Sequence, residues 1–305
     1  MADSRWPDLP LASWQDTRDT LQLWTQIAGK ICLALTPRVN HFWNIAMQLT
    51  PRGLATPPMS HGSRTFTLTF DLIGHEAVLE MADGTRDAVA LRPQTVAEFY
   101  AAMLSMLRRH GIDVRIWRMP VELPSPIPFD QDTVHKAYDA QAARQFLELL
   151  LAVKPVFDRF RAEFIGKSSP VHFFWGSFDL ALTRFSGRRA PERSGADSIT
   201  RESYSHEVIS HGWWPGSGAI AEPAFYAYAA PEPDGFKTVP VEPAAAFYSP
   251  DFSEFVLPYE AVRTAPSPAD ALYRFLRTTY DAGAALASWD RDSLERPATE
   301  WPQSG

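Results

Sequence analysis

Cysteine is almost absent from this sequence, because Cys32 is the only one among 305 residues. A single cysteine excludes an internal disulfide and any zinc or iron–sulfur site built from several cysteines. The sequence also lacks a run of about 18 apolar residues, the length that a membrane-spanning helix needs. It begins Met-Ala-Asp-Ser-Arg-Trp-Pro, without the apolar stretch of a secretory signal. We therefore expect a soluble cytoplasmic protein that does not use a membrane as a partner.

Basic residues are outnumbered, with 29 Lys and Arg against 36 Asp and Glu and a net charge of −7. Proteins that bind nucleic acid draw much of their affinity from cations that neutralise phosphates. We therefore do not expect nucleic acid as a partner. Apolar residues make up 45% of the chain and aromatic residues 12%. This composition excludes a disordered or fibrous chain and predicts a buried core.

An internal similarity organises the chain. Pro-Arg-Val-Asn-His-Phe-Trp at 37–43 is similar to Pro-Val-His-Phe-Phe-Trp at 170–175, and a helical pattern of apolar residues precedes each string. Several strand-like runs and a closing amphipathic helix follow each string, and Asp83-Gly84 marks a hairpin in the first. The sequence therefore predicts an α+β fold of two related α–β-meander–α repeats with antiparallel sheets, arranged pseudo-symmetrically.

The predicted boundaries follow these patterns. We expect a first repeat at 14–118 and a second repeat at 139–287, which holds more polar residues and therefore the expected site. A linker at 119–138 joins the repeats, and its prolines exclude a helix. Residues 1–13 and 288–305 are expected to be arms. A cleft between two such repeats is the expected position for a ligand.

The first candidate site residues lie between 167 and 184. If 171–183 is one extended strand, Trp175, Ser177 and Asp179 share a face. A carboxylate beneath an indole has the raised pKa that a general acid or base needs. The alternative is that Ser177 and Asp179 face water at an exposed edge. Lys167 and Arg184 are candidate ligand-binding cations, with Arg184 as an anchor for an anion; a solvated arginine-rich loop is the alternative.

Histidines supply the candidates for proton transfer. His172 or His206 would donate or accept a proton, with Asp179 or Glu207 as carboxylate partner. A purely structural histidine is the alternative. His206 and His211 are five residues apart and would face opposite sides of a strand, so no metal site is predicted from them.

Tyrosines supply the candidate walls of a pocket. Tyr226 and Tyr228 lie two residues apart in a strand-like run, and Tyr204 precedes the histidine string. Side chains two apart on a strand share a face, so these rings would offer a large contact area with polar tips to a ligand. The alternative is that they are ordinary half-exposed strand residues.

Five strings carry a resemblance to a known family: Leu-Trp-Thr-Gln-Ile at 23–27, Val-Asn-His-Phe-Trp at 39–43, Gly-Lys-Ser-Ser-Pro-Val-His-Phe-Phe-Trp-Gly-Ser-Phe-Asp at 166–179, Tyr-Ser-His-Glu at 204–207 and Pro-Ala-Phe-Tyr-Ala-Tyr at 223–228. Through them the chain resembles, over nearly its whole length, a bacterial family of uncharacterised proteins catalogued as a domain of unknown function. The resemblance implies no activity, cofactor or catalytic residue, so the predicted site depends on residue types alone.

These patterns lead to one hypothesis and two alternatives. We expect a small-molecule binding protein or an enzyme with a polar-aromatic cleft in the second repeat, and an anionic ligand would fit Arg184. One alternative is a non-catalytic interaction protein, such as a homodimer, sealed by Trp6, Trp14, Trp289 and Trp301. The other is a metal-dependent enzyme that uses histidine and carboxylate ligands. The sequence specifies no cofactor and does not decide between binding and catalysis.

Overall fold

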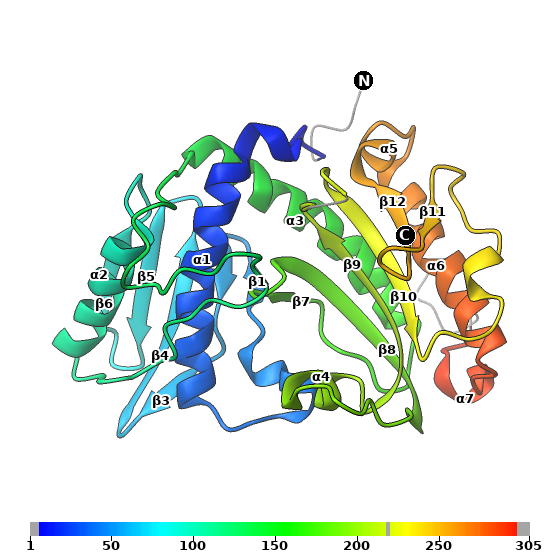
Figure 1. Cartoon of the computed structure of the whole chain (residues 1–305), viewed down its shortest axis with the longest axis horizontal. Helices are drawn as coiled ribbons and strands as arrows, with labels where there is room; N and C mark the ends of the chain where they lie inside the picture. The colour runs from blue at the N-terminus through cyan, green and yellow to red at the C-terminus, as the bar shows by residue number, and fades with distance from the viewer. Residues whose placement is uncertain (1–5, 218–219, 298–305) are drawn as a thin grey trace.

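The computed structural model describes residues 6–217 and 220–297, in which helices pack on two antiparallel sheets (Figure 1). Every strand pairing in these ranges is antiparallel. The predicted α+β class is therefore confirmed. No helix within the same ranges combines the length and the apolar character needed to cross a bilayer.

The first half of the chain builds one sheet, which follows one long helix in the sequence and precedes another. Helix α1 (Leu11–Leu35) leads through a 3-10 helix (Asn40–Ile45) into the sheet, and α2 (Val96–Arg109) closes it. The strand order is β1-β2-β4-β5-β6, with β3 paired to β4. The predicted Asp83-Gly84 hairpin connects β5 to β6, and Gly84 takes the positive φ of 87° that the turn requires. The strands are β1 (Gln48–Thr50), β2 (Gly53–Ala55), β3 (Met59–His61), β4 (Arg64–Asp71), β5 (Glu76–Met81) and β6 (Arg86–Ala90).

Helix α2 begins with a capping box and packs through its apolar face. The Thr95 hydroxyl accepts a hydrogen bond from the Glu98 amide, and the Glu98 carboxylate accepts one from the Thr95 amide, which satisfies two free donors at the helix start. The apolar face then buries Phe99, which stacks on Trp24 of α1 with ring centroids 4.7 Å apart. Thus α2 joins α1 to the sheet in a single core.

The second half repeats the order of a helix, a sheet and a closing helix. Helix α3 (Ala140–Ala162) begins after Asp139, whose carboxylate accepts hydrogen bonds from two amides of the first turn. The strand order is β11-β12-β10-β9-β8-β7. The strands are β7 (His172–Phe174), β8 (Asp179–Arg189), β9 (His206–Trp214), β10 (Ala224–Ala230), β11 (Phe247–Ser249) and β12 (Glu254–Pro258). The remaining helices are α4 (Ser198–Ser203), a 3-10 turn (Phe236–Thr238), α5 (Tyr259–Arg263), α6 (Pro268–Leu286) and α7 (Arg291–Leu294).

Helices α3 and α6 cover only one face of the second sheet (Figure 1). Their buried apolar residues, such as Phe160 of α3 and Phe275 of α6, contribute to the core on that side. We call this side the helix face of the sheet. The opposite side, which we call the cavity face, has neither α3 nor α6 against it, and the candidate site lies there.

The two sheets meet edge to edge. Met47, just before β1, and Phe173 of β7 exchange two backbone hydrogen bonds of 2.8 Å each. Apolar residues of both halves also belong to one continuous core, in which Trp14 of α1 packs on Phe146 of α3 with centroids 5.3 Å apart. The boundaries at 14–118 and 139–287 and the pseudo-symmetric arrangement of two related repeats stay predictions.

The proline-rich segment between the halves is a strap that crosses α1 (Figure 1). The Gln26 side chain of α1 fixes it, because its amide group donates to the Val121 carbonyl and its oxygen accepts from the Val121 amide, both at 2.9 Å. Phe129 anchors the next part of the strap by complete burial. The strap therefore brings Glu122 to a fixed place beside α1.

The aromatic residues predicted to seal a partner are used within the chain. Trp6 packs on Tyr259, and Trp289 packs on Tyr280, with centroids 6.3 Å and 6.1 Å apart. Both indoles and that of Trp14 are buried. They offer no exposed surface for the interaction-protein alternative. Trp301 lies outside the described residues, as do the rest of 298–305 and residues 1–5.

Candidate functional site

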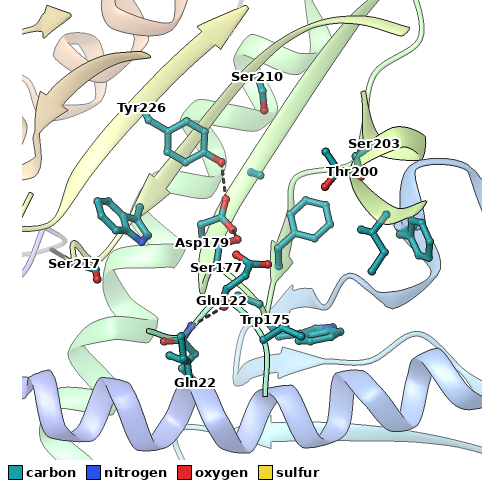
Figure 2. A pocket seen from close by; sticks show the side chains of 18 of the residues that line it. Gln22, Glu122, Trp175, Ser177, Asp179, Thr200, Ser203, Ser210, Ser217 and Tyr226 are labelled. Carbon is teal, nitrogen blue, oxygen red and sulfur yellow. Dashed lines mark hydrogen bonds between the residues drawn. The ribbon is translucent and has the colours of Figure 1, made fainter. Parts of the chain in front are cut away.

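A cavity of about 1000 Å³ lies against the cavity face of the second sheet. Its walls come from α1, the strap, the 3-10 helix before β1, and α4, while strands β8, β9, β10 and β12 form its floor. Figure 2 shows how its polar side chains converge, with Glu122 from the strap and Gln22 from α1 near Asp179 at the start of β8. The volume is at the upper end for sites that bind small molecules.

The floor follows from the alternation of side chains along neighbouring strands. Pairing across the sheet places residues of β8, β9 and β10 in rows on the cavity face. The hydroxyl oxygens of Thr183 and Ser210 lie 2.9 Å apart within one such row. The two central rows are Ala181, Gly212 and Tyr226, and Thr183, Ser210 and Tyr228.

Residues 171–183 form a hairpin, so the prediction of one extended strand is wrong. Strand β7 ends at Phe174, and the chain reverses before β8, with Phe178 in the left-handed region at φ 61°. Phe174 therefore lies opposite Asp179, while Phe173 pairs with Leu180 in the core. Ser177 reaches Asp179 because the chain turns between them. The strand alternation that we used to predict a shared face does not apply to these residues.

Asp179 is the most enclosed carboxylate of the cavity, with 5% of its surface exposed. It accepts hydrogen bonds from the Ser177 hydroxyl at 2.6 Å and from the Tyr226 hydroxyl at 2.5 Å (Figure 2). Burial raises the pKa of Asp179, and the two hydrogen bonds partly oppose that rise. The alternative in which Ser177 and Asp179 face open water is therefore wrong.

Gly212 allows Tyr226 to reach Asp179. Tyr226 stands on β10 and Asp179 on β8, so the ring must cross β9, which lies between them. It crosses over Gly212, where any Cβ atom would overlap the tyrosine ring. A side chain larger than hydrogen at 212 would therefore push Tyr226 away from the carboxylate.

Glu122 and Glu254 bring two further carboxylates to the cavity. Glu122 stands on the strap above Gly176, with its backbone in the left-handed region at φ 57°. Glu254 stands at the start of β12, on the cavity face. Protein atoms displace water from both carboxylates, and the charge of Asp179 adds to this effect, so the pKa of each rises to about 7.

None of these three carboxylates has a cationic partner in the described part of the chain, since no Lys, Arg or His nitrogen lies within 4.0 Å of any of them. Asp179 is buried, Glu254 is half-buried and Glu122 is exposed to the cavity. A buried carboxylate is ordinarily paired with a cation or with several donors. Within the described residues, two hydroxyl groups supply the side-chain hydrogen bonds, and Asp179 receives both. The cavity therefore has an uncompensated acidic end.

Aromatic rings line the cavity around the carboxylates, including several of the predicted ones. The Trp175 indole donates to the Ile45 carbonyl at 2.9 Å and lies against Gly29, where a Cβ would overlap it. The rings of Tyr226 and Tyr228 stack with centroids 6.0 Å apart. The Tyr204 hydroxyl donates to that of Tyr228 at 3.2 Å. The structure thus brings together Trp175, Ser177, Asp179, Tyr204, Tyr226 and Tyr228.

Arg184 lies on the opposite side of the sheet, so the prediction that it anchors a ligand is wrong. Its side chain is fully buried on the helix face, with the guanidinium 3.4 Å from the Phe160 ring centroid and 4.3 Å from that of Tyr280. It donates to the Phe160 carbonyl, and the Glu163 carboxylate is 4.0 Å away. Even-numbered residues of β8 face the helices, and odd-numbered residues face the cavity.

Glu207 and His206 do not form the predicted acid–base pair. They are consecutive on β9 and point to opposite sides. Glu207 pairs with Arg188 at 2.7 Å and accepts from the Ser186 hydroxyl at 2.8 Å, outside the cavity. His206 lies instead beside His41, with ring centroids 5.9 Å apart.

Lys167 also belongs to the group around His41, at the rim of the cavity. Its amine donates to His41 Nε2 at 2.7 Å, and His41 Nδ1 lies 3.1 Å from the Glu202 carbonyl. Burial and the nearby Lys167 charge lower the pKa of His41, so the ring is neutral and accepts at Nε2. The predicted residues Lys167 and His206 thus lie near each other and apart from the carboxylates.

His172 is enclosed and neutral. It is 1% exposed and packs on Phe174, and its Nε2 has no hydrogen-bond partner in the described ranges. Burial lowers its pKa to about 4, which removes the proton that a general acid would donate near pH 7. The residue does not line the cavity.

His206 and His211 occupy opposite faces of β9, since the His211 ring lies 3.0 Å from the Thr279 hydroxyl of α6 while His206 contacts His41. Because the two side chains point to opposite sides of the sheet, they cannot bind the same metal ion. Within residues 6–217 and 220–297, no group of three or more His, Cys, Asp or Glu side chains is arranged to hold a metal.

The residues of the site that the sequence analysis missed include Gln22, Lys30, Glu122 and Glu254. Glu122 has a local signal, because it is the only charged residue between Pro120 and Pro128. The others depend on the packing of α1 and β12 against the cavity, and no local pattern reports that packing.

Comparison with known protein families matches residues 6–296 to a family of unknown function, DUF5996. No curated protein and no solved structure shows significant similarity to the chain. The match agrees with the expected resemblance to an uncharacterised family. It assigns no chemistry to the cavity.

Proposed function

Because the chain belongs to DUF5996, a family of unknown function, we propose from its cavity alone that the protein binds a small organic molecule through a basic nitrogen. One observation carries the proposal: Asp179, Glu122 and Glu254 line a single cavity without a cationic partner in the described residues. A protonated amine would supply that partner. The anionic ligand predicted from Arg184 has no such support, because Arg184 lies on the helix face.

The energetics of the three carboxylates favour this reading. Like charges in a partly dehydrated site repel one another, and the raised pKa values of Glu122 and Glu254 reflect that repulsion together with the loss of water. A feature that destabilises the folded chain is typical of a functional site. A cationic ligand would remove the repulsion and form charge-assisted hydrogen bonds to the carboxylate oxygens.

The aromatic walls indicate what else the ligand carries. Trp43, Trp175, Trp214, Tyr226 and Tyr228 line the same cavity. Indole and phenol faces attract cations and also bury apolar surface. We therefore propose a ligand with a basic group on an apolar or aromatic body, small enough for about 1000 Å³.

The test compares two probes that differ only in charge. Octylamine and 1-octanol have the same alkyl chain, and at pH 8 the amine is protonated while Glu122 and Glu254 are mostly ionised. Calorimetric titration should show octylamine binding at least tenfold more tightly, the effect of about one charge-assisted hydrogen bond. Asp179→Asn and Glu254→Gln should each reduce this preference.

Glu207→Gln is the matched control, because it removes a carboxylate on the other side of the same sheet. It should leave octylamine binding unchanged. Equal affinity for amine and alcohol in the folded wild-type protein would contradict the proposal. Circular dichroism of each variant separates loss of binding from loss of folding.

A second candidate function is general acid–base catalysis at Glu122. The observation that favours it is a carboxyl group with a pKa of about 7 that stays open to the cavity beside Ser177. Screening with p-nitrophenyl esters and glycosides should then reveal turnover whose pH profile changes near 7. Glu122→Gln should reduce that turnover at least 100-fold, and unchanged turnover in this variant would rule the role out.

A further inference from the structure

Lys30 of α1 lines the same cavity and lacks any counter-charge. It is 4% exposed, and within the described residues its amine has neither an ion-pair partner nor a hydrogen-bond acceptor. A buried ammonium is ordinarily paired, because removing it from water is costly. The cavity therefore holds an unpaired cation as well as unpaired carboxylates.

Two indoles form the surroundings of Lys30. Its amine lies 4.5 Å from the ring centroid of Trp117 and 6.0 Å from that of Trp175. Such contacts compensate part of the lost hydration. Burial lowers the pKa of Lys30 to about 8. Trp117 is 67% exposed, so a ligand at Lys30 would also cover apolar surface that now faces water.

The other cationic groups at the cavity already have partners. Arg18 pairs with Asp19 at 3.0 Å and donates to the Gln22 side chain at 3.1 Å. Lys167 donates to His41, which itself is neutral. Lys30 is thus the cation that is left for a ligand in the described part of the cavity.

The spacing along α1 separates Lys30 from the acidic end. Gln22, Gln26 and Lys30 stand at four-residue intervals, on one side of the helix. The Gln22 amide donates at 2.6 Å to the Gly176 carbonyl, next to Ser177 (Figure 2). Eight residues of α-helix rise by about 12 Å, so the cation and the carboxylates lie on the order of 10 Å apart.

We propose that the ligand is a zwitterion, whose acidic group binds Lys30 and whose basic group binds the carboxylates around Asp179. The basic end rests on the proposed function above, while the acidic end is new. The chemical class is that of ω-amino acids, short peptides and their analogues, in which a carboxylate or phosphate lies about 10 Å from an amine. One molecule of this kind pairs both sets of charges that the chain leaves unpaired.

The experiment titrates the protein with ω-amino acids of five to ten carbons. Each affinity is compared with those of the alkylamine and the alkanoate of the same chain length. At the best length, the amino acid should bind wild-type protein about 10- to 100-fold more tightly than the amine, the effect of one charge-assisted pair. Lys30→Met should abolish this difference without weakening the amine. Lys237→Met, which removes an exposed lysine elsewhere, should preserve it.

Unfolding of the variant should not be the cause of any loss of binding. Lys30→Met replaces an unpaired buried cation with an apolar chain of similar length and should therefore raise the melting temperature. Equal binding of amino acid and amine by wild-type protein at every length would overturn the zwitterion while the proposed function stands. Binding of the alkanoate alone, lost in Lys30→Met, would overturn both the zwitterion and the basic ligand. Absence of binding by all three probes would also overturn both.

Discussion

Strand β8 carries a buried charged residue on each face, and the protein surrounds the two in opposite ways. Arg184 on the helix face is enclosed by the rings of Phe160 and Tyr280 and donates to a backbone carbonyl. Asp179 on the cavity face receives two hydroxyl hydrogen bonds but has two further carboxylates as neighbours in the cavity. Arg184 is thus held by aromatic faces and one backbone acceptor, while its Nε and Nη1 atoms have no hydrogen-bond partner in the described residues. Both carboxylate oxygens of Asp179 are hydrogen-bonded, but its neighbours in the cavity carry the same charge.

The comparison separates structural from functional charge. A charged side chain that aromatic rings of its own chain enclose contributes to packing, as the guanidinium of Arg184 does between α3 and α6. A set of charges that the fold leaves unpaired in an open cavity adds repulsion and no stability. Burial alone does not distinguish them, since both residues are almost fully enclosed.

The largest effect should come from the helix face. Arg184→Ala removes the side chain that fills the space between Phe160 and Tyr280, and we expect the free energy of unfolding to fall by about 3 kcal/mol in urea titrations. Arg184→Met keeps most of the volume and should cost less than about 1.5 kcal/mol. Octylamine should bind the folded Arg184→Met variant as it binds wild type; weaker binding would contradict a purely structural Arg184.

Gly212→Ala should have the next largest effect, on the cavity face. The added Cβ overlaps the Tyr226 ring and breaks its hydrogen bond to Asp179, which should lower the free energy of unfolding by about 2 kcal/mol and weaken octylamine binding. The matched control is Gly283→Ala in α6, where a Cβ would lie 3.0 Å from the movable Cδ1 of Ile209. Alanine favours a helix by about 1 kcal/mol, so this variant should lose little stability and no binding.

Local patterns in the sequence predicted much of the fold but only part of the site. The amphipathic pattern of helix α2, the Asp83-Gly84 turn and the alternation of Tyr226 and Tyr228 depend on nearby residues, and the structure bears them out. The strand prediction for 171–183 failed because the chain reverses between Phe174 and Asp179, with Phe178 in the left-handed region, and alternation alone does not reveal this turn. Asp179 still lies in the cavity, but the sequence analysis did not predict the turn that places Ser177 beside it.

The misplaced charges have a common physical cause. The sides of β8 and β9 are fixed by which face the helices cover, and that is a property of the whole fold. Arg184 and Glu207 were therefore assigned to the cavity on residue type, although they face away from it. Glu122 and Lys30 were missed for the converse reason, since only the path of the strap over α1 brings them to the site.

Glu254→Gln should stabilise the protein in a pH-dependent way. The carboxyl has a pKa of about 7 when folded against an ordinary 4.5, so the folded chain binds more protons between these pH values. The stability it contributes is fully present below pH 4.5 and is lost as the pH rises through 7. With allowance for water in the cavity, the variant should exceed wild type by about 1–2 kcal/mol at pH 8 and equal it at pH 4. An identical difference at both pH values in urea titrations would contradict the shift.

Glu207→Gln should have the smallest effect and completes the comparison, because it removes the same charge from the other side of the sheet. Glu207 is paired with Arg188, which is itself about half exposed, so the variant should lose at most about 1 kcal/mol. Its sign is therefore opposite to that of Glu254→Gln at pH 8. Urea titrations at pH 8 measure both variants under one condition. If Glu207→Gln also raised the free energy of unfolding, the stabilisation by Glu254→Gln would reflect only the lower net negative charge of the whole protein. That result would contradict a specific repulsion among the carboxylates of the cavity.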